Sequence, residues 1–175
     1  MSRNLKTTLK AWPVIAVATI GLCYLTQFTA ELFGITLPDQ QNIGVVRQWL
    51  QHAFDSAGNF ATCAFLLAQV LVLLPVIEEI VFRWLLFMLP AKAVESRLDR
   101  GGRVPRLALS VFASVLFSAA HYIAQPFPDA AFIALFFFGL AQCRLYCSTG
   151  RIGCPMLNHF LFNLTNLALL FVIPA

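Results

Sequence analysis

The chain has 175 residues, of which 59% are hydrophobic and only 11% are charged, and its mean hydropathy is +0.78. That composition excludes an ordinary soluble domain and predicts one compact helical bundle in a membrane. The net charge of +4 does not indicate a nucleic-acid partner, because the basic residues cluster at the ends of apolar runs, where they set membrane topology. The five cysteines are an odd number and predict no disulfide framework.

The N-terminal part, residues 1–59, is predicted to be one membrane helix followed by an interfacial connection. An apolar run over residues 12–33 follows Arg3, Lys6 and Lys10. No small-residue cleavage site closes this run, so it indicates a retained helix rather than a signal peptide. In the polar connection, residues 37–59, apolar side chains recur at helical spacing, which predicts a short amphipathic helix at the membrane interface.

Residues 60–175 hold four further predicted spans, at residues 60–89, 107–123, 130–146 and 155–173. Pro75 lies inside the first of these and predicts a kink, because proline lacks an N–H and clashes with the preceding turn. Gly139 and Ala141 are small residues that permit close helix packing. The predicted fold is therefore an all-α polytopic membrane bundle of about five transmembrane helices plus the short interfacial helix.

Lysine and arginine are unevenly distributed among the connections between spans. The loop of residues 92–106 holds the largest group, which is Lys92, Arg97, Arg100, Arg103 and Arg106. The N-terminal tail and the loop after residue 146 also carry basic residues, whereas the other connections carry one or none. By the positive-inside rule, this predicts a multi-pass integral membrane protein with a cytoplasmic N-terminus and an external C-terminus.

The second span carries three charged residues, Glu78, Glu79 and Arg83, inside an otherwise apolar run. A charge near the bilayer centre costs about 2.5–3.5 kcal/mol and usually marks a functional site. Glu79 and Arg83 are four residues apart and can pair on one helix face, whereas Glu78 has no partner on its own helix. An unpaired carboxylate suits a general base. A structural ion-pair cluster is the alternative.

Two other spans carry imidazole and amide side chains. His121 follows Phe117 by four residues and shares its helix face. In the last span, His159 and Asn163 begin a stripe that continues at Asn166.

Two further expectations concern the placement of these polar residues. Asn158 points away from the stripe and is predicted to cap the last span or to bond to the loop before it. A straight-helix arrangement sets His121 on the order of 10 Å away in depth from Glu78 and His159. Tilt or the kink at Pro75 has to bring them together.

These side chains suit the activation of water at a carbonyl group. Glu78 with His121 would hold and deprotonate a water molecule, and His159 with Asn163 would donate to the developing oxyanion. A zinc site made of Glu78, His121 and His159 is the alternative. Because the chain lacks a His-Glu-x-x-His motif, we favour the metal-free reaction.

The chain contains three motifs in order, each on a predicted span: Glu78-Glu79-x-x-x-Arg83, Phe117-x-x-x-His121 and His159-x-x-x-Asn163. Each motif alone is weak, but the ordered set resembles the motifs of the CPBP family, which includes CAAX proteases and bacteriocin-processing enzymes and is also called the Abi family. The resemblance covers residues 74–166. It implies that residues 60–175 form a membrane core of the CAAX-protease type.

The resemblance implies an intramembrane endopeptidase of the glutamic type, without a cofactor, that cuts near the C-terminus of a membrane-associated protein. The roles that it implies are water activation by Glu78 and His121, an oxyanion site of His159 and Asn163, and support from Glu79, Arg83 and Phe117. The chain is similar to short prokaryotic members, including a subgroup that acts on C-terminal sorting tails, which implies a prokaryotic inner or cell membrane. Some members are associated with immunity to bacteriocins, so a non-enzymatic immunity or scaffold protein is the alternative.

Overall fold

The computed structural model describes residues 2–37, 48, 51, 60–96, 103–123 and 130–172, and within these ranges every regular element is a helix. The all-helical prediction is confirmed. Four of the long helices are α1 (Arg3–Leu32), α6 (Arg103–Ala120), α7 (Ala131–Thr149) and α8 (Gly153–Val172). The predicted interfacial helix, except for positions 48 and 51, lies outside the described residues, as do residues 124–129.

The fifth long helix corresponds to the predicted second span and changes its winding along its length. Its parts are α3 (Phe60–Ala68), η1 (Gln69–Leu73), α4 (Leu74–Glu78), η2 (Glu79–Met88) and α5 (Leu89–Glu95), of which η1 and η2 are π-helical. Pro75 is buried in the first turn of α4, directly after the wider turn of η1. The predicted distortion at Pro75 therefore takes the form of a widened helix. Wide turns of this kind are frequent at functional sites.

Several helix ends differ from the prediction, and the structure gives the reasons. α1 begins at Arg3 rather than residue 12, because the Ser2 hydroxyl accepts a hydrogen bond from the Leu5 N–H and caps the helix. Residues 92–95 and 103–106 were predicted as loop but are helical. An ion pair between Arg106 and Glu95 joins these two helices.

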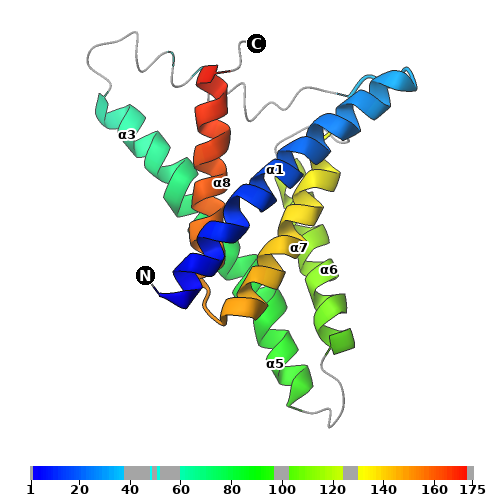
Figure 1. Ribbon diagram of the computed structural model, residues 1–175, viewed down its shortest axis with the longest axis vertical. Coiled ribbons are helices and arrows are strands. Elements are labelled where there is room, and N and C mark those ends of the chain that lie inside the picture. Colours follow the sequence, from blue (N-terminus) through cyan, green and yellow to red (C-terminus); the bar gives the residue numbers. More distant parts are fainter. Residues whose placement is uncertain are drawn as a thin grey trace.

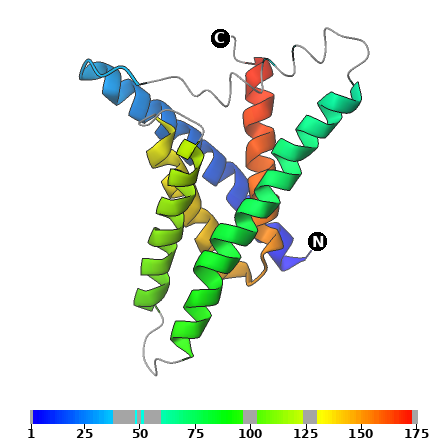
Figure 2. The ribbon, with the colours of Figure 1, turned by 180° about the vertical axis from the view of Figure 1, so that it is seen from behind.

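The five long helices run in alternating directions, and four of them form three layers (Figure 1). In Figure 1, α1 crosses the front of α7 and α8, and in the reverse view the long helix from α3 to α5 crosses the opposite face (Figure 2). α7 and α8 thus lie between α1 and the helix that carries the charged residues, and they contact both. The ends of α1, α5 and α7 that carry basic residues lie toward one side of the bundle.

The contact between α6 and α7 is close because of one glycine. A Cβ atom added to Gly139 on α7 would lie 2.9 Å from the Cβ of Ser114 on α6. Real side chains do not approach so closely, so glycine is required here. The predicted role of Gly139 in helix packing is confirmed.

The outer surface of the bundle is apolar, as a lipid-facing surface has to be. Exposed residues on α1 include Val14, Val17, Leu25 and Phe28. By length and composition, three described helices can cross a membrane: Arg3–Leu32, Ala61–Glu95 and Ala131–Thr149. Pro105–Ala120 is a shorter apolar helix, and α8 has the length but carries several polar side chains. The protein is a helical membrane bundle.

Candidate active site

The charged motif lies where α4 passes into η2, near the middle of the long helix. Glu79 and Arg83 are both fully buried, whereas the Glu78 side chain is 27% exposed. Arg83 Nε lies 3.2 Å from Glu79 Oε2, so the predicted pair within the helix is confirmed. Since a buried ion pair loses much hydration, it requires further polar or aromatic partners.

Phe117 on α6 supplies an aromatic partner for the buried guanidinium. Arg83 Cζ lies 4.2 Å from the centre of the Phe117 ring, a distance that favours a cation–π interaction. The same ring also lies edge-on to Phe82, with the centroids 5.4 Å apart. Phe117 is itself fully buried. The predicted supporting residue is thus a direct contact of the ion pair.

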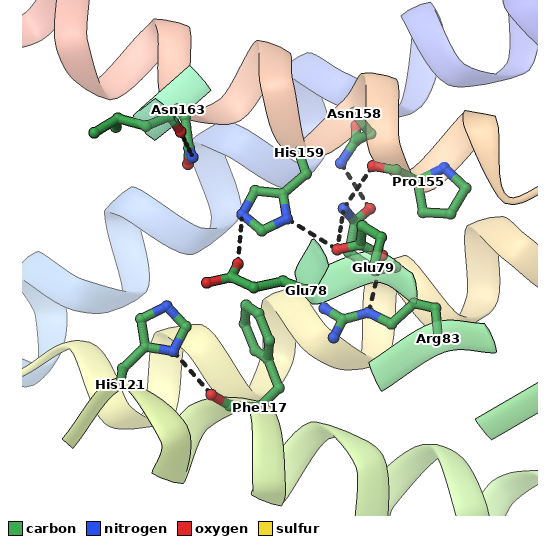
Figure 3. Close-up of polar contacts among 11 residues, drawn as sticks. Glu78, Glu79, Arg83, Phe117, His121, Pro155, Asn158, His159 and Asn163 are labelled. Carbon is green, nitrogen blue, oxygen red and sulfur yellow. Dashed lines mark hydrogen bonds and ion pairs between the residues drawn. The ribbon is translucent and has the colours of Figure 1, made fainter. Parts of the chain in front are cut away.

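His159 on α8 contacts both carboxylates of the charged motif, so Glu78 has a partner across the bundle although it has none on its own helix. Its Nδ1 lies 2.9 Å from Glu79 Oε1, and its Nε2 lies 3.5 Å from Glu78 Oε2 (Figure 3). An ionised carboxylate only accepts hydrogen bonds, so the Nδ1 proton of His159 points to Glu79. Nε2 faces Glu78, and it can donate to Glu78 or to a reacting group when the ring is an imidazolium.

His121 begins a 3₁₀ turn, η3 (His121–Ile123), at the end of α6. Its Nδ1 lies 2.8 Å from the Phe117 carbonyl oxygen. A carbonyl oxygen can only accept, so Nδ1 carries the proton. In the neutral ring, Nε2 is then the unprotonated nitrogen that can accept a proton from water.

The expected difference in depth between His121 and the other site residues does not separate them. The Phe117 ring lies 4.8 Å from the His121 ring and 6.0 Å from the His159 ring, centre to centre. Figure 3 shows the Glu78 carboxylate pointing into the space between the two imidazoles.

The side-chain amide of Asn163 on α8 is hydrogen-bonded to a backbone carbonyl group. Its Nδ2 donates to the Val70 carbonyl oxygen at 3.0 Å. The Leu74 N–H bonds to the Gln69 carbonyl, five residues back, and the next bond in this series would join residue 75 to Val70. Pro75 has no N–H, so Asn163 supplies the missing donor. One N–H of its amide group is used in this way, and the other can serve a substrate.

Two buried amides adjoin the charged motif: Gln142, which was not among the predicted site residues, and Asn158, which was assigned a different role. Gln142 on α7 and Asn158 on α8 are both fully buried. Asn158 Nδ2 donates to Gln142 Oε1 at 2.9 Å, and Gln142 Nε2 lies 3.4 Å from Glu79 Oε1. The prediction that Asn158 caps its helix or bonds to the loop is therefore wrong. A lone amide in an apolar span, as Gln142 is, was the available signal, because a buried amide needs partners.

The alternative predicted for the same site is a zinc ion held by Glu78, His121 and His159. Within the ranges that the structure describes, no group of three or more His, Cys, Asp and Glu side chains is arranged to hold a metal ion. Cys63, Cys143, Cys147 and Cys154 are free thiols.

Comparison with known families adds to this geometry. Residues 59–165 match the family described as Rce1-like, type II CAAX prenyl endopeptidase. No curated protein and no solved structure matches the chain. A helical membrane bundle with this match is a membrane-embedded protease. The match covers more than half of the chain, and the chain belongs to the Rce1-like family of type II CAAX prenyl endopeptidases.

Proposed function

We propose that this protein cleaves a membrane-associated protein near its C-terminus, with water activated by Glu78 and His121 and without a metal ion. The observation that carries the proposal is the contrast between the two adjacent glutamates. Glu79 is enclosed by Arg83 and His159, whereas Glu78 is partly exposed and faces His159 only at 3.5 Å. An enclosed carboxylate supports the site, and the accessible one can meet water and substrate.

The reaction follows from the positions of the protons. Glu78 takes a proton from water, which His121 Nε2 helps to orient, and the water oxygen attacks the scissile carbonyl carbon. The carbonyl oxygen becomes an oxyanion that accepts from the second N–H of Asn163 and from His159 Nε2, which carries a proton when the ring is an imidazolium. Such stabilisation is worth several kcal/mol for one donor. The carbon–nitrogen bond then breaks, and the proton held by Glu78 passes to the leaving amine.

The substrate class and the membrane side are part of the same proposal. The family description names type II CAAX prenyl endopeptidases. We extend this to a substrate with a C-terminal membrane-associated tail, of the sorting type that the resemblance to short prokaryotic members implies. Basic residues at the ends of α1, α5 and α7 lie on one side of the bundle, which supports a cytoplasmic N-terminus. Reporter fusions at residue 1 and at residue 175 test this orientation, and a reversed pattern would contradict it.

The test is co-expression of the protein with membrane proteins that have a C-terminal membrane-associated tail, followed by intact-mass measurement of each candidate substrate. Wild type shortens its substrate by a C-terminal fragment. Glu78→Gln preserves the shape of the side chain but cannot accept the proton, and it abolishes cleavage, as does His121→Ala. Glu31→Gln, at an exposed position on α1, is the matched control and leaves cleavage unchanged. Cleavage by the Glu78→Gln protein would overturn the proposed mechanism.

A further inference from the structure

Gln142 and Asn158 form a chain of amides that ends on the charged motif and has no part in the reaction as proposed above. Gln142 Nε2 is shared between two acceptors, Glu79 Oε1 at 3.4 Å and the Pro155 carbonyl oxygen at 3.0 Å. On its other side, Gln142 Oε1 accepts from Asn158 Nδ2 at 2.9 Å. Since Oε1 is fixed by a donor and Nε2 by two acceptors, the Gln142 amide has one orientation.

Glu79 has a polar partner on each of its carboxylate oxygens, but only Oε1 accepts hydrogen bonds, whereas Oε2 takes part in an ion pair alone. Oε2 faces Arg83 Nε at 3.2 Å, whereas Oε1 faces His159 Nδ1 at 2.9 Å and Gln142 Nε2. The carboxylate is therefore divided between the cation on its own helix and the imidazole on α8. This division holds the His159 ring in place, and with it the Nε2 atom that faces Glu78.

Arg83 provides a competing arrangement for Glu79. Nε and both Nη atoms of Arg83 are buried without a hydrogen-bond partner among the described residues, and so is Glu79 Oε2, although Nε and Oε2 lie 3.2 Å apart. Carboxylate and guanidinium groups favour a bidentate pair with two parallel hydrogen bonds. If the Glu79 carboxylate turned fully toward Arg83, two of these N–H groups would be satisfied and Oε1 would leave His159.

We propose that Gln142 is a positioning residue that keeps Glu79 divided between Arg83 and His159. Its Nε2 holds Glu79 Oε1 on the side of α8, and Asn158 and Pro155 hold Gln142. The function of the amide chain is to fix the direction of His159 Nε2. This inference rests on the proposed function, in which that atom stabilises the oxyanion.

The test is Gln142→Met, which retains the length of the side chain and removes the amide. Its first readout is NMR of the His159 imidazole, which does not depend on catalysis. The chain has only three histidines, so ¹⁵N-labelled imidazoles give few signals, and His52→Gln and His121→Gln assign them. We expect Gln142→Met to weaken the hydrogen bond at His159 Nδ1, so that its proton signal moves upfield, while the His121 signal stays in place.

The second readout is kinetic. Gln142→Met is expected to lower kcat on the order of 10-fold or more with little change in KM, because a misdirected donor affects the transition state. Gln27→Met is the matched control, since Gln27 also donates to a glutamate, Glu31, at 3.0 Å, but lies outside the site on α1. It leaves both readouts unchanged.

A rescue variant separates positioning from packing. Lysine presents a compact charge that does not form the bidentate pair, so Arg83→Lys in the Gln142→Met background returns Glu79 to His159 and restores part of the His159 signal. If Gln142→Met does not fold, Asn158→Leu tests the same chain from its outer end, with a smaller shift of the same signal.

The outcomes distinguish this inference from the proposed function. An unchanged His159 signal in both variants, in an otherwise active enzyme, overturns the positioning role. A shifted signal without rescue by Arg83→Lys also overturns it, because a packing defect then explains the shift. If wild type cleaves no substrate while the signal still shifts, the proposed function fails and the positioning of His159 by Gln142 stands.

Discussion

The side-chain amide of Asn163 donates to the main-chain carbonyl of Val70 at 3.0 Å, and this bond joins α8 to the π-helical turn before Pro75. It compensates for a backbone donor that proline lacks. Asn163 therefore has a structural role in addition to the proposed catalytic one. The two roles can be separated by restoring the missing N–H.

The first prediction is a double-mutant cycle between Asn163 and Pro75. Asn163→Ala leaves the Val70 carbonyl without a donor and is expected to cost about 1–2 kcal/mol in the free energy of unfolding. In a Pro75→Ala background the helix can satisfy its own carbonyls, and the cost of Asn163→Ala is expected to vanish. Denaturant unfolding in detergent micelles measures all four proteins, and equal costs in the two backgrounds would contradict this relationship.

Activity in the same four proteins tests the proposed role in the reaction. If Asn163 also stabilises the oxyanion, Asn163→Ala lowers kcat even in the Pro75→Ala background, where stability no longer changes. If cleavage returns to the level of Pro75→Ala alone, the contribution of Asn163 is structural and the oxyanion is stabilised without it.

The second prediction concerns the buried charges of Glu79 and Arg83. Arg83→Met leaves Glu79 without its buried cation and is expected to cost about 3–5 kcal/mol in unfolding free energy. The double variant Glu79→Gln with Arg83→Met removes both charges and is expected to cost less than Arg83→Met alone. The comparison is made by denaturant unfolding of the purified proteins. A double variant less stable than Arg83→Met would contradict the pairing.

The third prediction concerns the close contact of α6 and α7. Gly139→Ala places a methyl group 2.9 Å from Ser114 Cβ, and overpacking of this kind costs about 1–3 kcal/mol. Ser114→Gly is expected to recover part of that loss. Gly21→Ala is the matched control, because nothing lies within 4 Å of an added Cβ there. The thermal midpoint falls for Gly139→Ala and not for Gly21→Ala. A midpoint that Gly139→Ala left unchanged would contradict the contact.

The fourth prediction concerns metal. Purified protein is expected to contain no stoichiometric zinc, and cleavage is expected to persist in chelator, because Glu78 acts on water directly. Elemental analysis and a cleavage assay with and without chelator measure both. One bound zinc per chain, together with activity that chelator removes and added zinc restores, would replace glutamate chemistry with a metal-assisted reaction.

The amino-acid sequence alone determined the helical membrane fold and the three motifs, because both depend on local properties. Apolar length defines a span, and the spacing of Glu79 and Arg83 places both on one helix face. Phe117 and His121 are also four residues apart, so the sequence predicted that they share a helix face, and they are in contact. The distribution of lysine and arginine likewise depends on composition alone.

Only the tertiary structure decided how the helices meet. The bond of Glu79 to His159 and its contact with Gln142 join three helices, and no periodicity within one helix specifies such contacts. The hydrogen bond from Asn163 to the Val70 carbonyl depends on a π-helical turn. In that turn each N–H bonds five residues back, so the donor for Val70 would be residue 75, which is a proline without an N–H. Buried polar groups take the partners that three-dimensional packing brings to them, because within a membrane there is no water to replace a missing one.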